Sequence, residues 1–192
     1  MATIELANEL ADLITVTAAG EPHLCLQLDS QTKGLLPLPQ VQEVLSIKAE
    51  RFTLLPNMPG CVLGLLSHRS RAFYGLDLGE MLGLERLEST MAEYPLVILQ
   101  GENFIVGLAV SKVTGVVRLL PEQIDHQIEK YRLNNLRSKY LAGYGQQEVT
   151  DKLQGYWLLK AAALAQVTNQ DLAADYVADR QIRAANQGYR SG

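Results

Sequence analysis

The sequence predicts a mainly β fold made of many short strands. Three observations support this prediction: short apolar runs recur from about residue 24 to residue 119, Gly, Pro or polar turn residues separate them, and helical periodicity appears mainly outside this region. Many short strands separated by turns are typical of small barrels and sandwiches. The chain has 192 residues, of which 47% are hydrophobic, and this is enough for one domain or one bilobed unit.

The first elements are expected to be a helical extension and three strands. Residues 1–20 carry apolar side chains at broadly helical spacing. The apolar runs Leu24–Leu28 and Gly34–Leu38 flank the polar stretch Asp29–Lys33, which is the pattern of a hairpin. Val41–Ile47 is expected to form the next strand, although its alternation of apolar and polar residues is imperfect.

Two further strands surround a basic turn. Pro56–Gly60 contains two prolines and a glycine and is expected to be a loop. Cys61–Leu66 and Ala72–Leu76 are apolar and predict strands, with Ser67–Arg71 as the turn between them.

A short helix is expected directly after the second of these strands. Asp77 is a good N-cap for a helix that runs to Leu82, and Gly83 is a good residue to end it. Three more strands are then expected at Pro95–Leu99, Phe104–Val110 and Val113–Leu119, with a tight turn at Gly101–Asn103 between the first two.

The last part of the chain is expected to return to helical structure. Gln123–Tyr140 is charged and predicts a helix, and Gly143–Gly145 predicts a break. Tyr156–Leu159 has strand character, and its Trp157 is expected to be substantially buried. Ala161–Ala163 and Asn169–Gln187 predict helices.

Composition and charge exclude several classes of partner. The net charge is −4 and the pI is about 5.4, so we expect neither nucleic acid nor a membrane surface as a partner. The acidic start of the chain does not resemble a signal peptide, and no window approaches the roughly 20 apolar residues of a membrane-spanning helix. The two cysteines lie in apolar runs, which fits a reducing compartment. We therefore expect a cytoplasmic protein.

No pattern in the sequence indicates catalysis. The three histidines lie far apart and none has a partner at metal-ligand spacing, and neither a phosphate-binding loop nor a nucleophile elbow is present. We therefore predict no catalytic residue, no metal and no cofactor. One alternative remains open: Cys61 and His68 could form a thiol–imidazole pair in a small cysteine-dependent enzyme, or they could be a core cysteine and a loop histidine.

The strongest candidate for a binding site is the basic turn Ser67–Arg71. Arginine is enriched among residues that anchor protein interfaces, although two arginines can also serve only to keep a hairpin soluble. Glu43 is a charge within an apolar strand, and it either faces water or protects a sheet edge from wrong pairing. The residues by themselves therefore predict a β-rich binding module.

Several segments, in the same order and at similar spacing, resemble the CheW-like family of chemotaxis coupling proteins. In that family a "VQE" strand leads to a "P-N-x-P" loop and then to "GV-x-NLRG", "P-V-x-DL" and a late "YLxGLG" segment. The matching segments here are Val41–Val44, Leu55–Pro59, Val62–Arg69, Leu76–Leu78 and Tyr140–Gly145. The resemblance covers roughly residues 22–166.

The resemblance implies a fold and a function. The fold would be two intertwined five-stranded SH3-like β-barrels that share a core, with helices at the N and C termini. The domain boundaries would be 1–20 for the N-terminal helical extension, 21–166 for the CheW-like domain and 167–192 for the C-terminal helix and tail. The function would be that of an adaptor between a chemotaxis-type histidine kinase, bound through its own CheW-like regulatory domain, and the cytoplasmic tip of methyl-accepting receptors. An alternative is a stand-alone interaction module outside chemotaxis.

The resemblance also names candidate partner-binding residues. Arg69 matches the family arginine at the coupling surface, Gly64 matches the glycine before that turn, and Val41 and Glu43 match strand positions linked to receptor or kinase contact. Ser70 stands where the family has a glycine, and a serine reaches positive φ less readily, so the turn is expected to differ in shape. These departures suggest a divergent subgroup, serving pilus-based motility or phototaxis.

Overall fold

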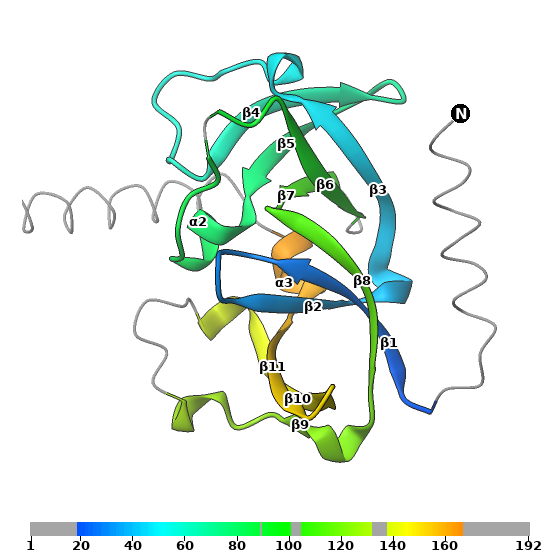
Figure 1. Cartoon of the computed structure of the whole chain (residues 1–192). Coiled ribbons are helices and arrows are strands. Elements are labelled where there is room, and N and C mark those ends of the chain that lie inside the picture. The colour runs from blue at the N-terminus through cyan, green and yellow to red at the C-terminus, as the bar shows by residue number, and fades with distance from the viewer. Residues whose placement is uncertain (1–18, 89, 101–104, 132–137, 167–192) are drawn as a thin grey trace, which may run out of the picture.

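A computed structural model describes residues 19–88, 90–100, 105–131 and 138–166 (Figure 1). Most of the expected N-terminal helix, the turn at Gly101–Asn103 and the helix expected at Asn169–Gln187 lie outside these described residues.

The described chain folds into two sheets, which confirms the mainly β class. The six-stranded sheet has the order β8-β1-β2-β11-β10-β9, and the five-stranded sheet has the order β3-β6-β7-β5-β4. The strands of the first sheet are β1 (Glu21–Gln27), β2 (Lys33–Pro37), β8 (Lys112–Leu119), β9 (Ile124–Asp125), β10 (Leu141–Val149) and β11 (Lys152–Leu159). Those of the second are β3 (Val41–Lys48), β4 (Val62–His68), β5 (Arg71–Asp77), β6 (Glu93–Gln100) and β7 (Ile105–Ala109).

The two sheets are intertwined along the chain. β1 and β2 lie in the same sheet as the late strands β8–β11, and the whole five-stranded sheet is inserted between them (Figure 1). Thr53, just after β3, forms a bridge to Leu65 of β4, so the two ends of the five-strand order are joined through this segment.

The helical elements are short. α2 (Leu78–Leu82) begins at Asp77, whose side chain accepts from the Glu80 N–H, and it ends at Gly83, which has φ 87°, as the sequence predicts. α3 (Ala161–Ala165) follows β11. The single-turn elements are η1 (Leu38–Gln40), η2 (Ala49–Arg51), η3 (Pro121–Gln123), η4 (Ile128–Lys130) and η5 (Ser138–Tyr140).

The largest apolar cluster lies between the two sheets and is built by both of them. It takes Leu24 and Leu36 from the six-stranded sheet, Leu99 and Leu108 from the five-stranded sheet, and Leu164 from α3. A second cluster occupies the opposite face of the five-stranded sheet, and a third lies within the six-stranded sheet. The two halves therefore share one core.

A bulge in β3 explains why its alternation is imperfect in the sequence. The pairing of β3 with β6 shifts register between Val41 and Glu43. An extra residue reverses the alternation of faces, so Val41 and Val44 both pack against the shared cluster although they are three residues apart. Glu43 then lies on the same face as Leu45, which packs against the second cluster.

Two predictions for the late part of the chain are wrong. The described part of Gln123–Tyr140 contains β9 and two single turns rather than a helix, because Ile124 pairs with β10 and Asp125 accepts from the Gln127 N–H and the Tyr131 hydroxyl. Gly143–Gly145 is not a break but lies inside β10. A Cβ on Gly143 would lie 2.7 Å from the Asp125 carbonyl oxygen, so close packing on β9 requires glycine there.

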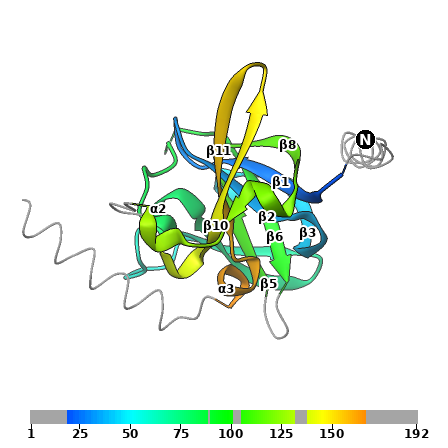
Figure 2. The same ribbon diagram turned by 90° about the horizontal axis from the view of Figure 1, so that it is seen from below.

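Trp157 is less than fully buried but packs against the shared cluster, in line with the sequence-based prediction, and its ring lies against those of Tyr131 and Tyr144 at centroid distances of 5.6 and 4.8 Å. The neighbouring Tyr156 is 4% exposed and lies in the third cluster. Adjacent residues of a strand face opposite sides, and the apolar run Tyr156–Leu159 does not reveal which side is the more buried. Figure 2 shows that the hairpin of β10 and β11 projects from the body of the molecule.

Candidate partner-binding surface

One end of the five-stranded sheet carries a ring of mostly polar side chains, one from each strand. They line a hollow of about 290 Å³ together with Phe73 and Ile98. The five residues are Glu43 of β3, His68 of β4, Arg71 of β5, Gln100 of β6 and Ile105 of β7. Leu45, Leu66, Phe73 and Ile98, two residues along four of these strands, belong to or pack against the second cluster. The ring therefore surrounds the open end of this cluster. We name the hollow and its lining residues the barrel mouth.

Glu43 is the centre of the polar contacts at the barrel mouth. Its Oε1 accepts from Arg69 Nη2 at 2.9 Å, and its Oε2 lies 3.3 Å from His68 Nε2. Because an ionised carboxylate only accepts, Nε2 carries the hydrogen in this contact. The Glu43 side chain is 17% exposed and that of Arg69 is 72% exposed. Glu43 is thus an inner anchor, and Arg69 is a guanidinium that faces solvent.

The hairpin turn between β4 and β5 brings Arg69 to this position. His68 pairs with Arg71, which leaves Arg69 and Ser70 as a two-residue turn. Their φ angles are 48° and 61°, as a turn of type I′ requires. Ser70 therefore adopts the left-handed conformation although it lacks the freedom of glycine, and each such residue stores about 1–2 kcal/mol of strain.

The free edge of β4 next to this turn is already covered. Thr53 and Leu65 exchange two backbone hydrogen bonds of 2.9 Å, and Arg51 Nη2 donates to the Ser67 carbonyl at 3.1 Å. A partner strand would have to displace these contacts in order to pair with β4. The barrel mouth therefore presents side chains next to a β4 edge whose backbone is already paired at Leu65 and Ser67.

Gly64 lies apart from the barrel mouth. It is buried in β4 at a register shift, has φ 146°, and a Cβ there would lie 2.6 Å from the Thr53 carbonyl oxygen. Gly64 thus permits the close approach of Thr53 that covers the β4 edge. The structure gives it a backbone role, and direct contact with a partner stays a prediction.

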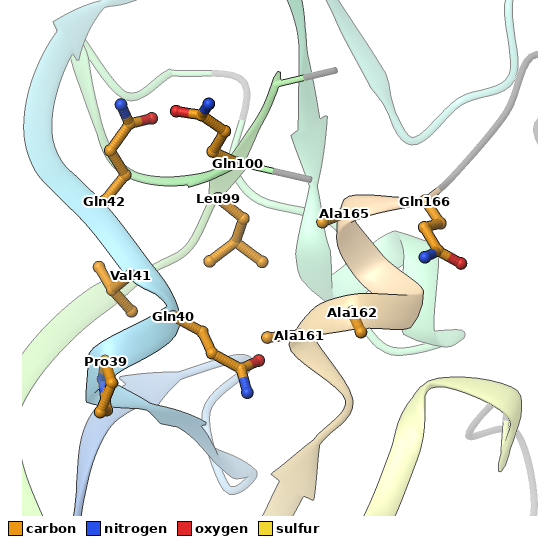
Figure 3. Close-up of a pocket in the computed structure, with 10 residues that line it drawn as sticks. All are labelled: Pro39, Gln40, Val41, Gln42, Leu99, Gln100, Ala161, Ala162, Ala165 and Gln166. Carbon is orange, nitrogen blue, oxygen red and sulfur yellow. The ribbon is translucent and has the colours of Figure 1, made fainter. Parts of the chain in front are cut away.

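A second hollow, of about 700 Å³, lies beside the barrel mouth between α3 and the adjoining ends of β3 and β6 (Figure 3). We name this second hollow the groove. Its lining residues are Pro39, Gln40, Val41, Gln42, Leu99, Gln100, Ala161, Ala162, Ala165 and Gln166. Figure 3 shows the amides of Gln42 and Gln100 next to each other at one end. Both glutamines also line the barrel mouth, so the two hollows form one continuous surface.

The structure brings most of the predicted binding residues to this surface. Val41 lines the groove, Glu43 and Arg69 line the barrel mouth, and Ser70 is exposed at the adjoining turn. Sequence reasoning missed Gln42 and Gln100. Gln100 was detectable, because it is the first polar residue after an apolar run and lies two residues beyond Ile98, on the same face of the strand.

The candidate pair of Cys61 and His68 does not form. Cys61 is 4% exposed in the shared cluster, directly before β4, and His68 is the last residue of β4. At about 3.3 Å per strand residue, the seven steps between them place their Cα atoms about 23 Å apart. The reading as a thiol–imidazole enzyme site is therefore wrong.

The described ranges contain no group of three or more His, Cys, Asp or Glu side chains that could hold a metal ion. None of the helices in the described part of the chain is long and apolar enough to cross a membrane.

Comparisons with known proteins point to one family. A family model described as CheW-like domain matches residues 22–165. Among solved structures, the scaffolding protein TtCheW from Thermoanaerobacter tengcongensis is similar, with a TM-score of 0.63 and 17% sequence identity over 81% of this chain and 94% of that chain. At this level of identity the structural similarity concerns the fold. No curated protein matches the chain by sequence.

Proposed function

The chain belongs to the CheW-like domain family, and from this membership we propose that it is an adaptor of chemotaxis-type signal transduction. The observation that carries the proposal is the family match over residues 22–165. Proteins of this family act as scaffolds rather than as enzymes, and we infer the same for this chain.

The proposed partners are a chemotaxis-type histidine kinase, bound through its CheW-like regulatory domain, and the cytoplasmic tip of a methyl-accepting receptor. The continuous surface of the barrel mouth and the groove supports this proposal, because an adaptor needs an exposed site with both apolar and charged groups. We propose Val41, Glu43, Arg69 and Ser70 as contact residues on it, and Gly64 as a residue that shapes β4.

The place of action is proposed to be the cytoplasm, where kinases and receptor tips of this kind meet. Ser67 and Ser70 replace the asparagine and glycine of the family turn motif. These departures support a divergent subgroup, for which we propose a role in pilus-based motility or phototaxis. A strain lacking the gene would then lose directed twitching or light response while retaining the motility machinery itself.

Binding measurements test the adaptor role directly. The full chain is titrated by calorimetry with the purified kinase regulatory domain, and separately with receptor-tip fragments from the same genome. We expect stoichiometric binding to both, and a larger complex when all three are mixed. A chain that binds neither partner would overturn the proposal. Binding to other cytoplasmic proteins alone would favour the alternative of an interaction module outside chemotaxis.

A further inference from the structure

We propose that the barrel mouth accepts an acidic side chain of the bound partner and that Arg71 is its counter-ion. This inference rests on the proposed adaptor function and adds the chemistry of the contact. The two arginines at the hairpin differ in their ion-pair partners. Arg69 already has a carboxylate partner in Glu43. Arg71 is exposed, and among the described residues no carboxylate lies within ion-pair distance of it.

The surroundings of Arg71 suit a carboxylate. Three apolar side chains, those of Phe73, Ile98 and Ile105, line the same hollow as Arg71. Gln42 and Gln100 place amide groups, which can donate hydrogen bonds, at the rim. A charged pair beside apolar side chains interacts more strongly than one surrounded by water. A guanidinium also offers the fork of donors that binds a carboxylate through two hydrogen bonds.

The size and charge of the barrel mouth limit what can enter. Its volume of about 290 Å³ is at the lower end of small-molecule sites and suits a single side chain. Arg69 and Arg71 are among its lining residues, and Glu43 is the one carboxylate among the lining residues that the structure describes. This cationic region stands on a chain with a net charge of −4, so charge complementarity favours an acidic group of a protein partner.

Charge changes at Arg71 test the inference. Arg71→Gln and Arg71→Glu are compared with the wild type in the titrations against the kinase domain and the receptor tip. For one of these two partners we expect binding about tenfold weaker for Arg71→Gln and weaker still for Arg71→Glu, with the loss shrinking at high salt. Lys112→Glu is the matched control, because Lys112 is an exposed cation on β8 that lines neither hollow. Unchanged affinity of Arg71→Glu, or an equal loss for Lys112→Glu, would overturn the inference and leave the adaptor function standing.

A second variant removes the dependence on Arg71 itself. Gln42→Glu adds a carboxylate at the rim of the same hollow, which would pair with Arg71 within the chain. We expect it to weaken binding of the same partner, and unaltered binding would contradict the inference. The partner's acidic residues are then changed singly to Lys. One of these changes should restore binding to Arg71→Glu, and failure of every such change would count against a specific pair. If the wild type binds neither partner, the adaptor function fails and this inference fails with it.

Discussion

At the scale of single residues, the barrel mouth separates two roles that a basic turn can have. Glu43 contacts both Arg69 and His68, so the Glu43 carboxylate and the Arg69 guanidinium are already paired with each other inside the chain. Arg71 lines the same hollow without such a partner among the described residues. The family resemblance singles out Arg69 alone, because Arg71 has no counterpart in the motif. Variants of Arg71 are therefore informative about partner binding, in addition to the variants of Arg69 that the resemblance suggests.

Arg69→Ala is expected to weaken binding to the kinase domain or the receptor tip at least tenfold while the melting temperature stays close to that of the wild type. The side chain is 72% exposed, and such exposed ion pairs contribute about 0–1 kcal/mol to stability. In a complex the same group would be partly desolvated, where losing one member of a charged pair has a larger effect. Calorimetric titration and thermal unfolding measure the two quantities.

The control for this prediction is Lys112→Ala rather than Arg71→Ala. Arg71 lines the same hollow as Arg69, so both arginine variants are expected to weaken binding, whereas Lys112 lines neither hollow. If Arg69→Ala unfolds the protein, Arg69 is structural and its assignment to the coupling surface fails.

Ser70→Gly is expected to stabilise the protein by about 1 kcal/mol. Ser70 has φ 61°, a conformation that glycine adopts without the penalty that other residues carry. Ser67→Gly is the matched control: Ser67 is exposed within β4, where glycine weakens a strand, so the sign should reverse. Urea unfolding measures both, and a destabilising Ser70→Gly would show that the turn conformation is not strained.

Gly64→Ala is expected to destabilise the protein more than Gly115→Ala. Both glycines have positive φ, 146° and 131°, so both alanine variants carry backbone strain of about 1–3 kcal/mol. A steric clash is added at Gly64, where a Cβ meets Thr53, whereas none of the described residues lies within 4 Å of a Cβ at Gly115. The difference between the two free energies of unfolding isolates the clash. Equal values would mean that Thr53 can move away freely.

At the scale of elements, Asp77 connects β5 to α2 and to the loop beyond it. It is fully buried, its Oδ1 accepts from the Glu80 N–H at 3.1 Å, and its Oδ2 accepts from the Leu87 N–H at 2.8 Å. Burial raises the pKa of Asp77 above its usual 3.8, although the backbone hydrogen bonds and Arg86 act in the opposite direction. One carboxylate therefore positions a helix and a loop at a desolvation penalty.

Asp77→Ala is expected to lower the free energy of unfolding by about 2 kcal/mol or more, because it removes a helix cap and leaves the buried Leu87 N–H without its acceptor.

The contribution of Asp77 to stability is expected to depend on pH. Since the folded-state pKa is raised, the contribution of Asp77 is fully present below the unfolded pKa of about 3.8 and declines as pH rises through the folded value. The stability of the wild type relative to Asp77→Asn should therefore decrease as pH rises from about 3.8. Urea unfolding at several pH values measures this, and a relative stability that increases with pH would contradict it.

At the scale of the whole molecule, the shared cluster couples the folding stability of one sheet to that of the other. Each sheet has a smaller cluster of its own, but the largest cluster is built jointly by residues of both sheets, α2 and α3. The order of the chain reinforces this, since β1 and β2 join strands that come last in sequence. The two sheets are therefore expected to unfold together.

Leu99→Ala is expected to lower the free energy of unfolding by about 2–5 kcal/mol, as deletions of buried leucine side chains do. Leu99 belongs to β6 and is 1% exposed in the shared cluster. Trp157, the single tryptophan, reports from the other sheet. Its fluorescence and far-UV circular dichroism should show one coincident transition, shifted equally by the variant. Two separate transitions would mean that the sheets unfold independently.

Local patterns in the sequence determined most of the strands and one cap. The hairpin of β1 and β2, the strands on either side of the basic turn, and the helix from Asp77 to Gly83 all follow from short-range chemistry: apolar runs, turn residues and capping groups. The CheW-like motifs then pointed to Glu43 and Arg69 as members of one surface, and the two side chains do form an ion pair.

Tertiary contacts decided the rest. Gln123–Tyr140 has a helical pattern, but pairing of Ile124 with β10 overrides it in the described part, and Gly143–Gly145 continues a strand because β9 packs too closely for a side chain. Gln42, Arg71 and Gln100 join Glu43 at the barrel mouth because the strands of one sheet end together there. Which strands become neighbours depends on burial shared between residues far apart in the chain. A local pattern therefore predicts a strand, but it does not predict what lies across from it.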